Sequence, residues 1–299
     1  MQRLWGKSPG KRAKKTPYDG ANCGLQPSSE VPDLRSDDAK DGSGCELKNS
    51  LFFMFWGERM QKTKIEYLTH TWNPIVGCEG LACVVAKVCW ARKQARRQKN
   101  RCDLCYSFVP HVHFERFDQP LKVKKPSRIG VSFSGEFFSL QIPDWVRSQI
   151  MIRILNAKQH TFFILTKQPQ NINIRQKVGI LPRLDLAWLE EVYPSNLWIG
   201  VSVNVKRDLW RIADLKSVHA HKFISFEPLL EDLGEIISGV SALFEGIEWV
   251  IIGAQTKPKK LPSYSWVRRI LNEARNHNVP VFMKNNVGWY AEIQEFPKT

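Results

Sequence analysis

The sequence has no apolar run long enough to cross a membrane, which takes about 20 residues in a helix. Its most hydrophobic short stretch is LFFMFW at residues 51–56. This stretch lies too far from the first residue, and has too few small residues after it, to act as a secretory signal. We therefore expect a soluble, cytoplasmic protein without a membrane partner.

Acidic side chains are few. The 299 residues contain 29 Asp and Glu against 44 Lys and Arg, which gives a formal net charge of +15. The excess does not come from the N-terminal segment, because residues 1–59 hold ten basic and eight acidic side chains and residues 60–299 keep a charge of +13. A basic folded region favours a polyanionic partner, and we expect DNA or RNA.

The N-terminal segment also lacks any helical or strand periodicity. Residues 1–50 are rich in Ser, Gly, Asp, Lys and Pro, a composition typical of disordered chains. Met60, in the sequence MQKTKI, resembles a natural start of translation. We therefore expect residues 1–59 to be a disordered or over-called extension, and residues 60–299 to form one folded domain.

The seven cysteines are an odd number, so they cannot all pair as disulfides within the chain. In a reducing compartment, closely spaced cysteines are more typical of metal or catalytic sites. Three of them lie in the stretch GCEGLACVVAKVCWA, with the spacing Cys78-x4-Cys83-x5-Cys89. Three thiolates suit an iron–sulfur cluster that leaves one iron without a protein ligand.

A second pair of cysteines follows, as Cys102-x2-Cys105, and precedes the segment HVH at residues 111–113. Zinc in structural sites takes four N or S ligands, so Cys102 and Cys105 would complete a zinc site with two of the earlier cysteines. The spacing leaves this alternative open. It also leaves open a set of three cluster ligands that includes Cys102 or Cys105.

Short β-rich runs alternate with helical patterns from residue 128 onward, which favours an α/β fold with a parallel sheet. The expected strands are residues 64–71, 128–136, 161–167, 197–203, 222–227, 249–255 and 279–285, and the clearest helices are residues 144–157 and 263–278. This number of units fits a partial or complete (β/α) barrel better than a flat sheet.

Polar side chains stand at the ends of these runs. Because parallel strands end at one face, and sites are built there, we expect these side chains to surround a site. They are Glu136, Thr166 and Lys167, Ser202 and Asn204, Ser225 and Glu227, Gln255 and Thr256, and Lys284, Asn285 and Asn286.

Several blocks of sequence resemble a known family. They are TWNPIVGC at residues 71–78, CWAR at 89–92, ILTK at 164–167, SFEPLL at 225–230 and FMKN at 282–285. Together they resemble the phage- and prophage-associated three-cysteine family of unknown function, whose usual spacing is Cys-x3-Cys-x2-Cys. That motif is similar to the one in radical S-adenosylmethionine (SAM) enzymes, where three thiolates hold a [4Fe–4S] cluster at the mouth of a partial (β/α) barrel.

The resemblance implies a set of cofactor residues. Cys78, Cys83 and Cys89 match the cluster ligands, and Trp90 occupies the aromatic position that often contacts the SAM adenine. The segment Ser134-Gly135-Glu136 resembles the motif that receives the SAM amino group, which a carboxylate binds by a charge-assisted hydrogen bond. Positions that match sites for the SAM ribose, the SAM carboxylate, a phosphate or the substrate are Lys167, Ser202, Asn204, Ser225, Glu227 and Lys284.

The function implied by the resemblance is that of a radical SAM-like enzyme that generates a 5′-deoxyadenosyl radical. Its cofactors would be a [4Fe–4S] cluster and SAM, with zinc at the pair Cys102 and Cys105 as a second metal. An electron donor such as a flavodoxin or ferredoxin would be a partner. No catalytic residue that acts on the substrate is assigned.

The basic residues fall into three groups, residues 92–101, 122–128 and 257–260, which we expect to border one mouth and to bind a phosphate backbone. Phe137, Phe138 and Trp289 are candidates to stack on bases. The alternative function is a non-catalytic, zinc-stabilised nucleic-acid-binding protein. A SAM-independent redox protein or a degenerate pseudoenzyme is the third hypothesis.

Overall fold

The computed structural model describes residues 59–80, 83–172, 193–233 and 241–297. Contacts between residues divide the chain into two units, Met1–Leu51 and Phe52–Thr299, and every described residue belongs to the second. The predicted extension, residues 1–59, therefore lies outside the described residues except for Arg59. The boundary at residue 60 stays a prediction.

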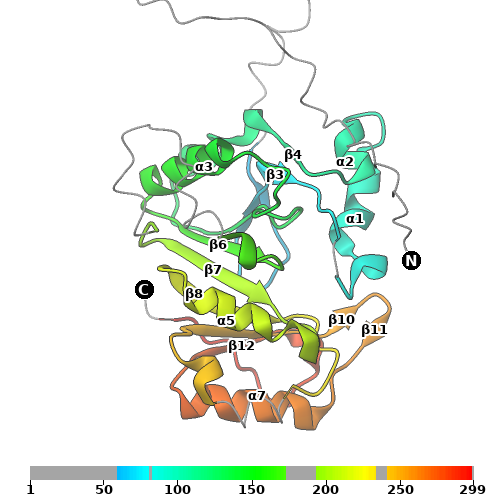
Figure 1. The fold of residues 1–299 in the computed structure, drawn as a ribbon, viewed down its shortest axis with the longest axis vertical. Coiled ribbons are helices and arrows are strands. Elements are labelled where there is room, and N and C mark those ends of the chain that lie inside the picture. Colours follow the sequence, from blue (N-terminus) through cyan, green and yellow to red (C-terminus); the bar gives the residue numbers. More distant parts are fainter. Residues whose placement is uncertain (1–58, 81–82, 173–192, 234–240, 298–299) are drawn as a thin grey trace, which may run out of the picture. The chain divides into compact units, whose positions relative to one another are not determined.

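The described chain contains one large sheet and two short ribbons (Figure 1). The strands of the large sheet are β1 (Gln61–Lys62), β2 (His70–Trp72), β5 (Arg128–Val131), β6 (Thr161–Thr166), β7 (Leu197–Ser202), β8 (His221–Phe226), β9 (Trp249–Ile252) and β12 (Val281–Met283), in that spatial order. All neighbours from β2 to β12 are parallel, and β1 pairs antiparallel with β2. The ribbons pair β3 (Ile75–Val76) with β4 (His111–Val112), and β10 (Gln255–Thr256) with β11 (Lys259–Lys260).

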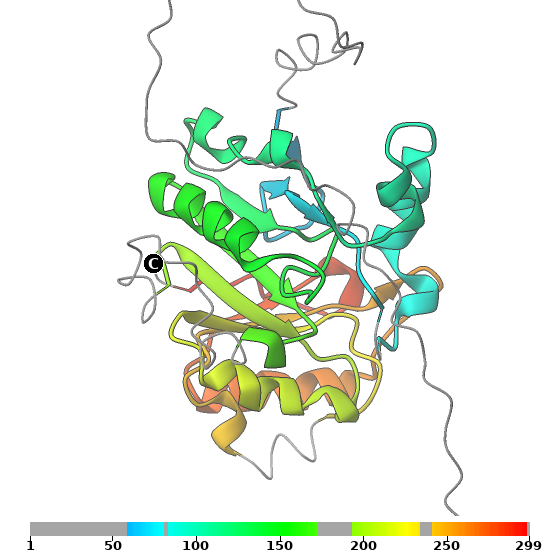
Figure 2. The same cartoon turned by 45° about the horizontal axis from the view of Figure 1, so that its top comes forward.

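The α-helices of the described chain are α1 (Trp90–Ala95), α2 (Asp103–Ser107), α3 (Asp144–Asn156), α5 (Trp210–Lys216) and α7 (Tyr264–Asn276). Figures 1 and 2 show α3 and α7 with the strands of the curled sheet between them, and both helices pack on the same face of that sheet. The two short helices α1 and α2 lie together at the C-terminal ends of the strands.

Both faces of the sheet are buried. Successive strand residues point to opposite faces, so Phe162 and Ile164 of β6 face the helices while Phe163 faces the other way. The helix-covered face packs residues such as Ile154 of α3 and Ile270 of α7. Burial on both sides explains why these strands have nearly continuous apolar sequences.

The inner face is filled by a second apolar group, and this shows that the sheet curls. The group consists of Tyr67, Leu68, Phe163, Trp198, Phe223, Trp249, Ile251 and Phe282. Tyr67 precedes β2 at one end of the sheet, yet its ring lies 5.8 Å from the ring of Phe282 in β12 at the other end. The backbone N–H of Asn285 also donates to Glu66 at 2.9 Å. The two ends approach without pairing among the described strands, so the α/β fold is a partial barrel.

Each predicted strand and helix has a counterpart, but four of the predicted strands differ clearly in extent. The run predicted over residues 64–71 forms a strand only from His70, and the run predicted over residues 249–255 ends at Ile252. The run predicted over residues 128–136 forms a strand only to Val131, because Ser132 turns the chain with a φ of +55°. Its N–H donates to Trp72 O at 2.7 Å. The run predicted over residues 279–285 forms a strand only at Val281–Met283. Within the described residues, no helix has the length and apolar character needed to span a membrane.

Candidate cofactor and metal sites

The motif Thr-Trp-Asn-Pro positions the first cysteine. Trp72 is fully buried, and its indole N–H donates to Arg116 O at 2.7 Å. The side-chain oxygen of Asn73 accepts from Ser134 N–H at 3.0 Å, and Pro74 O accepts from His113 N–H at 2.8 Å. The motif therefore joins the end of β2 to the segment after β5 and to the segment after β4.

Gly77 completes this attachment, one residue before Cys78. It has a φ of +90°, and a Cβ there would lie 2.1 Å from Val109 O. Only glycine avoids both the strain and the collision. Its N–H donates to Ser134 O at 3.1 Å, and its carbonyl accepts from Glu136 N–H at 2.9 Å. The cysteine loop therefore begins directly beside the segment predicted to bind the SAM amino group.

Cys78, Cys83 and Cys89 are all free thiols and all partly buried. Burial raises the pKa of the Cys78 thiol to about 11, and the Gly80 N–H that donates to its sulfur at 3.3 Å acts against this shift. The nearby Lys167 ammonium also acts to lower this pKa. A bound cation would shift the thiols to thiolates, which is the form that ligates metals.

The loop lies over the ends of the first strands of the barrel. Cys78 is near enough to Glu136 and Lys167 for their charges to act on it. Cys83 is likewise near enough to Arg211, at the start of α5, for its charge to act on that side chain. Burial lowers the pKa of Arg211, and Cys83 acts against this shift. The three strands β5, β6 and β7 thus end beneath the cysteines, where the sequence predicted a site.

Glu136 is buried and joins the ends of β5 and β6. Its carboxylate accepts hydrogen bonds from the Thr166 hydroxyl at 2.5 Å, from Lys167 N–H at 3.1 Å and from Phe138 N–H at 3.2 Å. Burial raises the pKa of this carboxyl group, and the three donors act in the opposite direction. A carboxylate has about four acceptor positions, so three donors leave one for a ligand.

Glu79 is a residue of this site that the sequence did not single out. Its carboxylate accepts from the buried hydroxyl of Ser139 and, at 3.4 Å, from the side-chain amide of Gln168. The contact ties the cysteine loop to the segments that follow β5 and β6. Its position directly after Cys78 was the available signal, but a glutamate in a loop is common on any protein surface and does not by itself indicate a contact.

The later strand ends also meet. Ser202 and Ser225 are register partners in β7 and β8, and both are buried. Lys284, after β12, forms an ion pair with Glu227, after β8. Asn204 is fully buried and donates from its side chain to Pro228 O at 2.9 Å. Two buried atoms at this edge, Ser225 Oγ and Asn204 Oδ1, have no hydrogen-bond partner in the described chain.

Trp90 is half exposed and begins a segment that we call the arm, residues 90–108, which contains α1 and α2. Ala91, Ala95 and Phe108 form the buried core of the arm, against which Cys78 and Cys89 pack. The exposed face is basic and carries Lys93, Arg96, Arg97, Lys99 and Arg101. The predicted basic group at residues 92–101 is thus a solvated face at the edge where the strands end.

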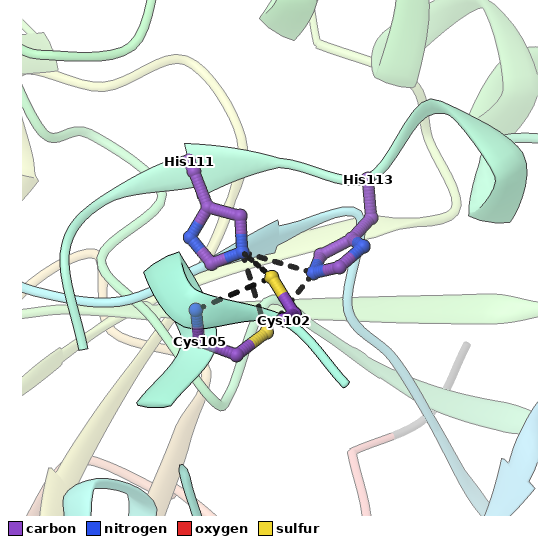
Figure 3. A group of neighbouring side chains, drawn as sticks. All are labelled: Cys102, Cys105, His111 and His113. Atoms are coloured by element: carbon purple, nitrogen blue, oxygen red, sulfur yellow. Dashed lines mark hydrogen bonds between the residues drawn. The ribbon is translucent and has the colours of Figure 1, made fainter. Parts of the chain in front are cut away.

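A second set of metal-ligating side chains lies where the arm meets β4 (Figure 3). Cys102, Cys105, His111 and His113 each direct one ligand atom to a common point, and these atoms all lie within 4.8 Å of one another. We call this the Cys2His2 group. Burial raises the pKa of the Cys105 thiol to about 12 and lowers the pKa of His111. The second cysteine pair, Cys102 and Cys105, therefore lies with two histidines and not with two of the earlier cysteines.

Two predictions about nucleic-acid contacts are wrong. Residues 122–128 lead into β5, so they lie where the strands begin, at the opposite end from the arm. Phe137 and Phe138 are 1% and 3% exposed, because the chain turns back after Glu136 and buries both rings in the core between sheet and helices. Neither ring can stack on a base.

The group at residues 257–260 and Trp289 do lie where the strands end. Lys257, Lys259 and Lys260 are exposed in and beside the β10–β11 ribbon. Figures 1 and 2 show this ribbon and α1 on the same side of the molecule. Trp289 stacks on Tyr264 with a centroid separation of 4.1 Å and an interplanar angle of 8°.

Comparison with known proteins places the chain in a family. The model of the family DUF5131, described as a protein of unknown function, matches residues 62–298. The chain belongs to this family. The match includes both cysteine sets and every strand from β2 to β12. No curated protein matches this DUF5131 chain.

The DUF5131 chain is also similar to solved structures of spore photoproduct lyase. With the complex of that enzyme with dinucleoside spore photoproduct, the TM-score is 0.46 and the identity 11%, over 73% of this chain and 64% of the other. A variant with bound AdoMet and the same ligand gives 0.44 and 10%, over 73% and 64%. A third structure gives 0.48 and 10%, over 75% and 78%. This chain spans less than two thirds of the length of the first structure.

Proposed function

We propose that the protein is a radical SAM-like enzyme with a barrel of the radical-SAM type, and that it acts on a nucleic acid or a nucleotide. The observation that carries the proposal is the placement of three free, partly buried thiols on one loop above the ends of parallel strands. Three thiols from one loop are the donor set that a [4Fe–4S] cluster with one open iron requires. Cys78, Cys83 and Cys89 would hold it.

When bound, the cluster supplies the electron that cleaves SAM into methionine and a 5′-deoxyadenosyl radical. The residues of the chain would bind the cluster and SAM, orient them and shield them from water. The Gly80 N–H and the Lys167 ammonium favour the thiolate form of Cys78. The apolar core of the arm excludes water from one side of Cys78 and Cys89.

Glu136 would receive the SAM ammonium at its remaining acceptor position. The Ser225 hydroxyl and the side-chain oxygen of Asn204 are buried without hydrogen-bond partners in the described chain, and unpaired buried polar atoms are costly unless a ligand satisfies them. They would bind the ribose hydroxyls. Lys167 rather than Lys284 would bind the SAM carboxylate, because Lys284 is already paired with Glu227.

Charge and exposed aromatic rings support a nucleic-acid or nucleotide substrate. The arm and the β10–β11 ribbon present exposed lysines and arginines at the edge that carries the cysteine loop. Tyr264 at the start of α7 forms an aromatic platform with Trp289 and the 80%-exposed Tyr290 after β12, beside a pocket of about 180 Å³. Stacking on such rings is tolerant of base identity. We further propose a cytoplasmic, phage-associated protein supplied with electrons by a flavodoxin or ferredoxin.

The test is anaerobic reconstitution with iron and sulfide, followed by an assay for 5′-deoxyadenosine in the presence of SAM and dithionite. The unaltered chain should bind about four iron ions, with a brown, oxygen-sensitive absorption, and release 5′-deoxyadenosine. Cys89→Ser should lose both. If the unaltered chain forms no cluster, or if Cys89→Ser leaves iron content unchanged, the proposal is wrong.

The second candidate function is a non-catalytic, zinc-stabilised nucleic-acid-binding protein. The Cys2His2 group favours it, since such groups are typical of structural zinc sites. This function predicts a colourless protein that binds DNA or RNA and does not bind SAM. Isothermal titration with SAM on the reconstituted chain separates the two functions.

A further inference from the structure

We propose that Cys102, Cys105, His111 and His113 bind one Zn²⁺ ion in a closed, tetrahedral site, and that this site fastens the arm to β4, the partner of the strand that leads into Cys78. The proposal goes beyond the proposed reaction, because it concerns a metal that takes no part in SAM cleavage. It follows from the tautomers of the two histidines, from the distances between ligand atoms and from the connections of the site.

The histidine rings point two lone pairs at each other. His111 Nδ1 lies 2.7 Å from Val109 O, and His113 Nδ1 lies 2.6 Å from a carboxylate oxygen of Glu115. A carbonyl oxygen and a carboxylate oxygen only accept hydrogen bonds, so each Nδ1 carries the proton. In the neutral rings both Nε2 atoms are then unprotonated, yet they lie 2.9 Å apart. A shared cation turns this repulsion into attraction.

The partners of Nδ1 are those that metal-bound histidines have. A ligating histidine usually donates its other N–H to a carboxylate or a backbone carbonyl, which fixes the ring and raises its basicity. Glu115 supplies the first kind of partner for His113 and Val109 supplies the second for His111. The Cys105 N–H also donates to Cys102 Sγ at 3.4 Å, which helps to fix the position of that sulfur.

The distances fit a single ion. With zinc bonds of about 2.3 Å to sulfur and 2.0–2.1 Å to nitrogen, tetrahedral geometry separates the ligand atoms by about 3.3–3.8 Å. His111 Nε2 lies 3.6 Å from Cys102 Sγ and 3.3 Å from Cys105 Sγ, within this range. His113 Nε2 lies closer, 3.1 Å from Cys105 Sγ and 2.9 Å from His111 Nε2, so an ion would move this ring outward by a few tenths of an ångström. Because Cys105 approaches both histidines, the group does not divide into a cysteine half and a histidine half, as a two-iron cluster with two of each would require.

The ligand set selects zinc. Two thiolates and two imidazoles in a tetrahedron are typical of Zn²⁺, and the two negative charges neutralise the ion. Four protein ligands leave no open position, so the site is structural rather than catalytic. The sequence spacing is Cys-x2-Cys-x5-His-x-His.

The site connects the arm to the cysteine loop. Cys102 and Cys105 belong to the arm, whereas His111 belongs to β4, which pairs with β3 two residues before Cys78. Cys78 N–H itself donates to Phe108 O, between the two halves of the site, at 3.2 Å. Zinc therefore holds together the segments on both sides of this hydrogen bond, and its removal should loosen the start of the loop.

Native mass spectrometry and elemental analysis of the aerobically purified full chain test the proposal. We expect one zinc ion per chain, retained in a variant with Cys78, Cys83 and Cys89 all changed to Ser. We expect loss of zinc in Cys105→Ser. Because Cys105 is buried and this variant could fail to fold, His113→Ala, at a side chain that is 12% exposed, is the second variant. Zinc that is absent from the unaltered chain, or retained by both single variants, or lost by the triple variant, overturns the proposal.

A finer test uses Glu115→Gln, which leaves all four ligands in place. Losing the carboxylate partner of a ligating histidine weakens metal binding by about 10–100-fold. Competition with a chelator for Zn²⁺, and the visible bands of Co²⁺ in the same site, measure this loss. The matched control is Asp118→Asn, an exposed carboxylate nearby that pairs with Arg153 and should leave the affinity unchanged. Equal affinities for Glu115→Gln and the unaltered chain contradict the assignment.

The two proposals fail separately. A chain that binds zinc at these residues and cleaves no SAM leaves the zinc site standing and removes the proposed reaction. A chain that cleaves SAM but holds no zinc, whether purified aerobically or anaerobically, leaves the proposed reaction standing and removes the zinc site.

Discussion

Gly77 and Gly135 pair in an isolated parallel bridge that fixes two distant segments side by side. One residue after each glycine stands a predicted cofactor residue, Cys78 after Gly77 and Glu136 after Gly135. A Cβ on Gly135 would lie 2.9 Å from Gly77 O, so both positions require the smallest residue. Direct backbone contact therefore sets the spacing between the start of the cysteine loop and the segment after β5.

Gly77→Ala should disrupt this bridge. The new methyl group would collide with Val109 O and the residue would keep a strained φ, so we expect a loss of at least about 2 kcal/mol in the free energy of unfolding. The matched control is Gly80→Ala. Gly80 also has a positive φ, but a Cβ there meets nothing closer than Arg92 at 3.5 Å, so the loss should be near 1 kcal/mol. Urea unfolding measures both. Equal losses would show that the contact with Val109 is unimportant.

Glu136→Gln tests the junction of β5 and β6. Each carboxylate oxygen accepts from a backbone N–H, of Phe138 at Oε1 and of Lys167 at Oε2, so the NH₂ group that replaces either oxygen faces another donor in a buried position. An unsatisfied buried donor costs about 1–3 kcal/mol, and the melting temperature should fall accordingly. Glu292→Gln, at an exposed position, is the control and should change stability by less than about 0.5 kcal/mol. An unchanged melting temperature for Glu136→Gln would mean that its hydrogen bonds are dispensable.

The end of β7 depends on a buried ion pair. Asp208 and Arg211 lie 3.0 Å apart with side chains 3% and 4% exposed. Asp208 also accepts from Asn204 N–H, and Arg211 donates to Ser202 O. Asp208→Asn leaves the Arg211 charge buried and uncompensated, so we expect a loss of about 3–5 kcal/mol.

An exposed ion pair provides the comparison for this prediction. Arg275 and Glu295 form two short hydrogen bonds, but their side chains are 48% and 37% exposed. Arg275→Ala should therefore cost only about 0.2–1 kcal/mol in chemical unfolding. If the loss for Asp208→Asn is no larger than this, burial does not determine the strength of the Asp208–Arg211 pair.

The main strands and the two long helices were predictable because their sequences record burial. Phe162 to Ile164 is apolar without interruption since both faces of β6 are covered, and the helix over residues 144–157 begins after a proline at the expected place. Strand ends were less predictable. Ser132 turns the chain because its N–H and hydroxyl bond to the segment at Trp72–Ile75, a contact between residues 57 or more positions apart that no local pattern records.

The Cys2His2 group shows a second limit. Cys102 and Cys105 stood out by their spacing, whereas His111 and His113 meet them because α2 ends before Phe108, whose φ of +60° turns the chain back. A single left-handed residue that is not glycine leaves no pattern in the sequence. The burial of Phe137 and Phe138 was missed for a similar reason, because both rings follow a polar strand end, where exposed side chains are expected.

The basic arm offers a comparison between two groups of equal charge. Lys93, Arg96 and Arg97 are exposed where the strands end, and Lys122, Lys124 and Lys125 are exposed where they begin. Changing either trio to Gln removes three positive charges. For single-stranded DNA, the arm variant should lower the slope of log affinity against log salt by about 2, because each lost phosphate contact removes about 0.7.

The variant at residues 122–125 should leave that slope nearly unchanged. Fluorescence anisotropy at several salt concentrations gives both values. Equal slopes for the two variants would mean that net charge, rather than the position of the arm, attracts the nucleic acid.

Trp289 is the central ring of the aromatic platform that it forms with Tyr264 and Tyr290. Its indole stacks on Tyr264 and its Nε1 is buried without a hydrogen-bond partner in the described chain, so the ring serves packing and stacking. Trp289→Ala should weaken binding of single-stranded DNA by about 1–3 kcal/mol, the value of one base stacked on an aromatic ring. Trp289→Phe keeps a ring parallel to Tyr264 and should restore most of the affinity, while the salt slope stays that of the unaltered chain. If Phe is as weak as Ala, or if the slope changes, the platform acts through folding of the segment after β12 and not through stacking on bases.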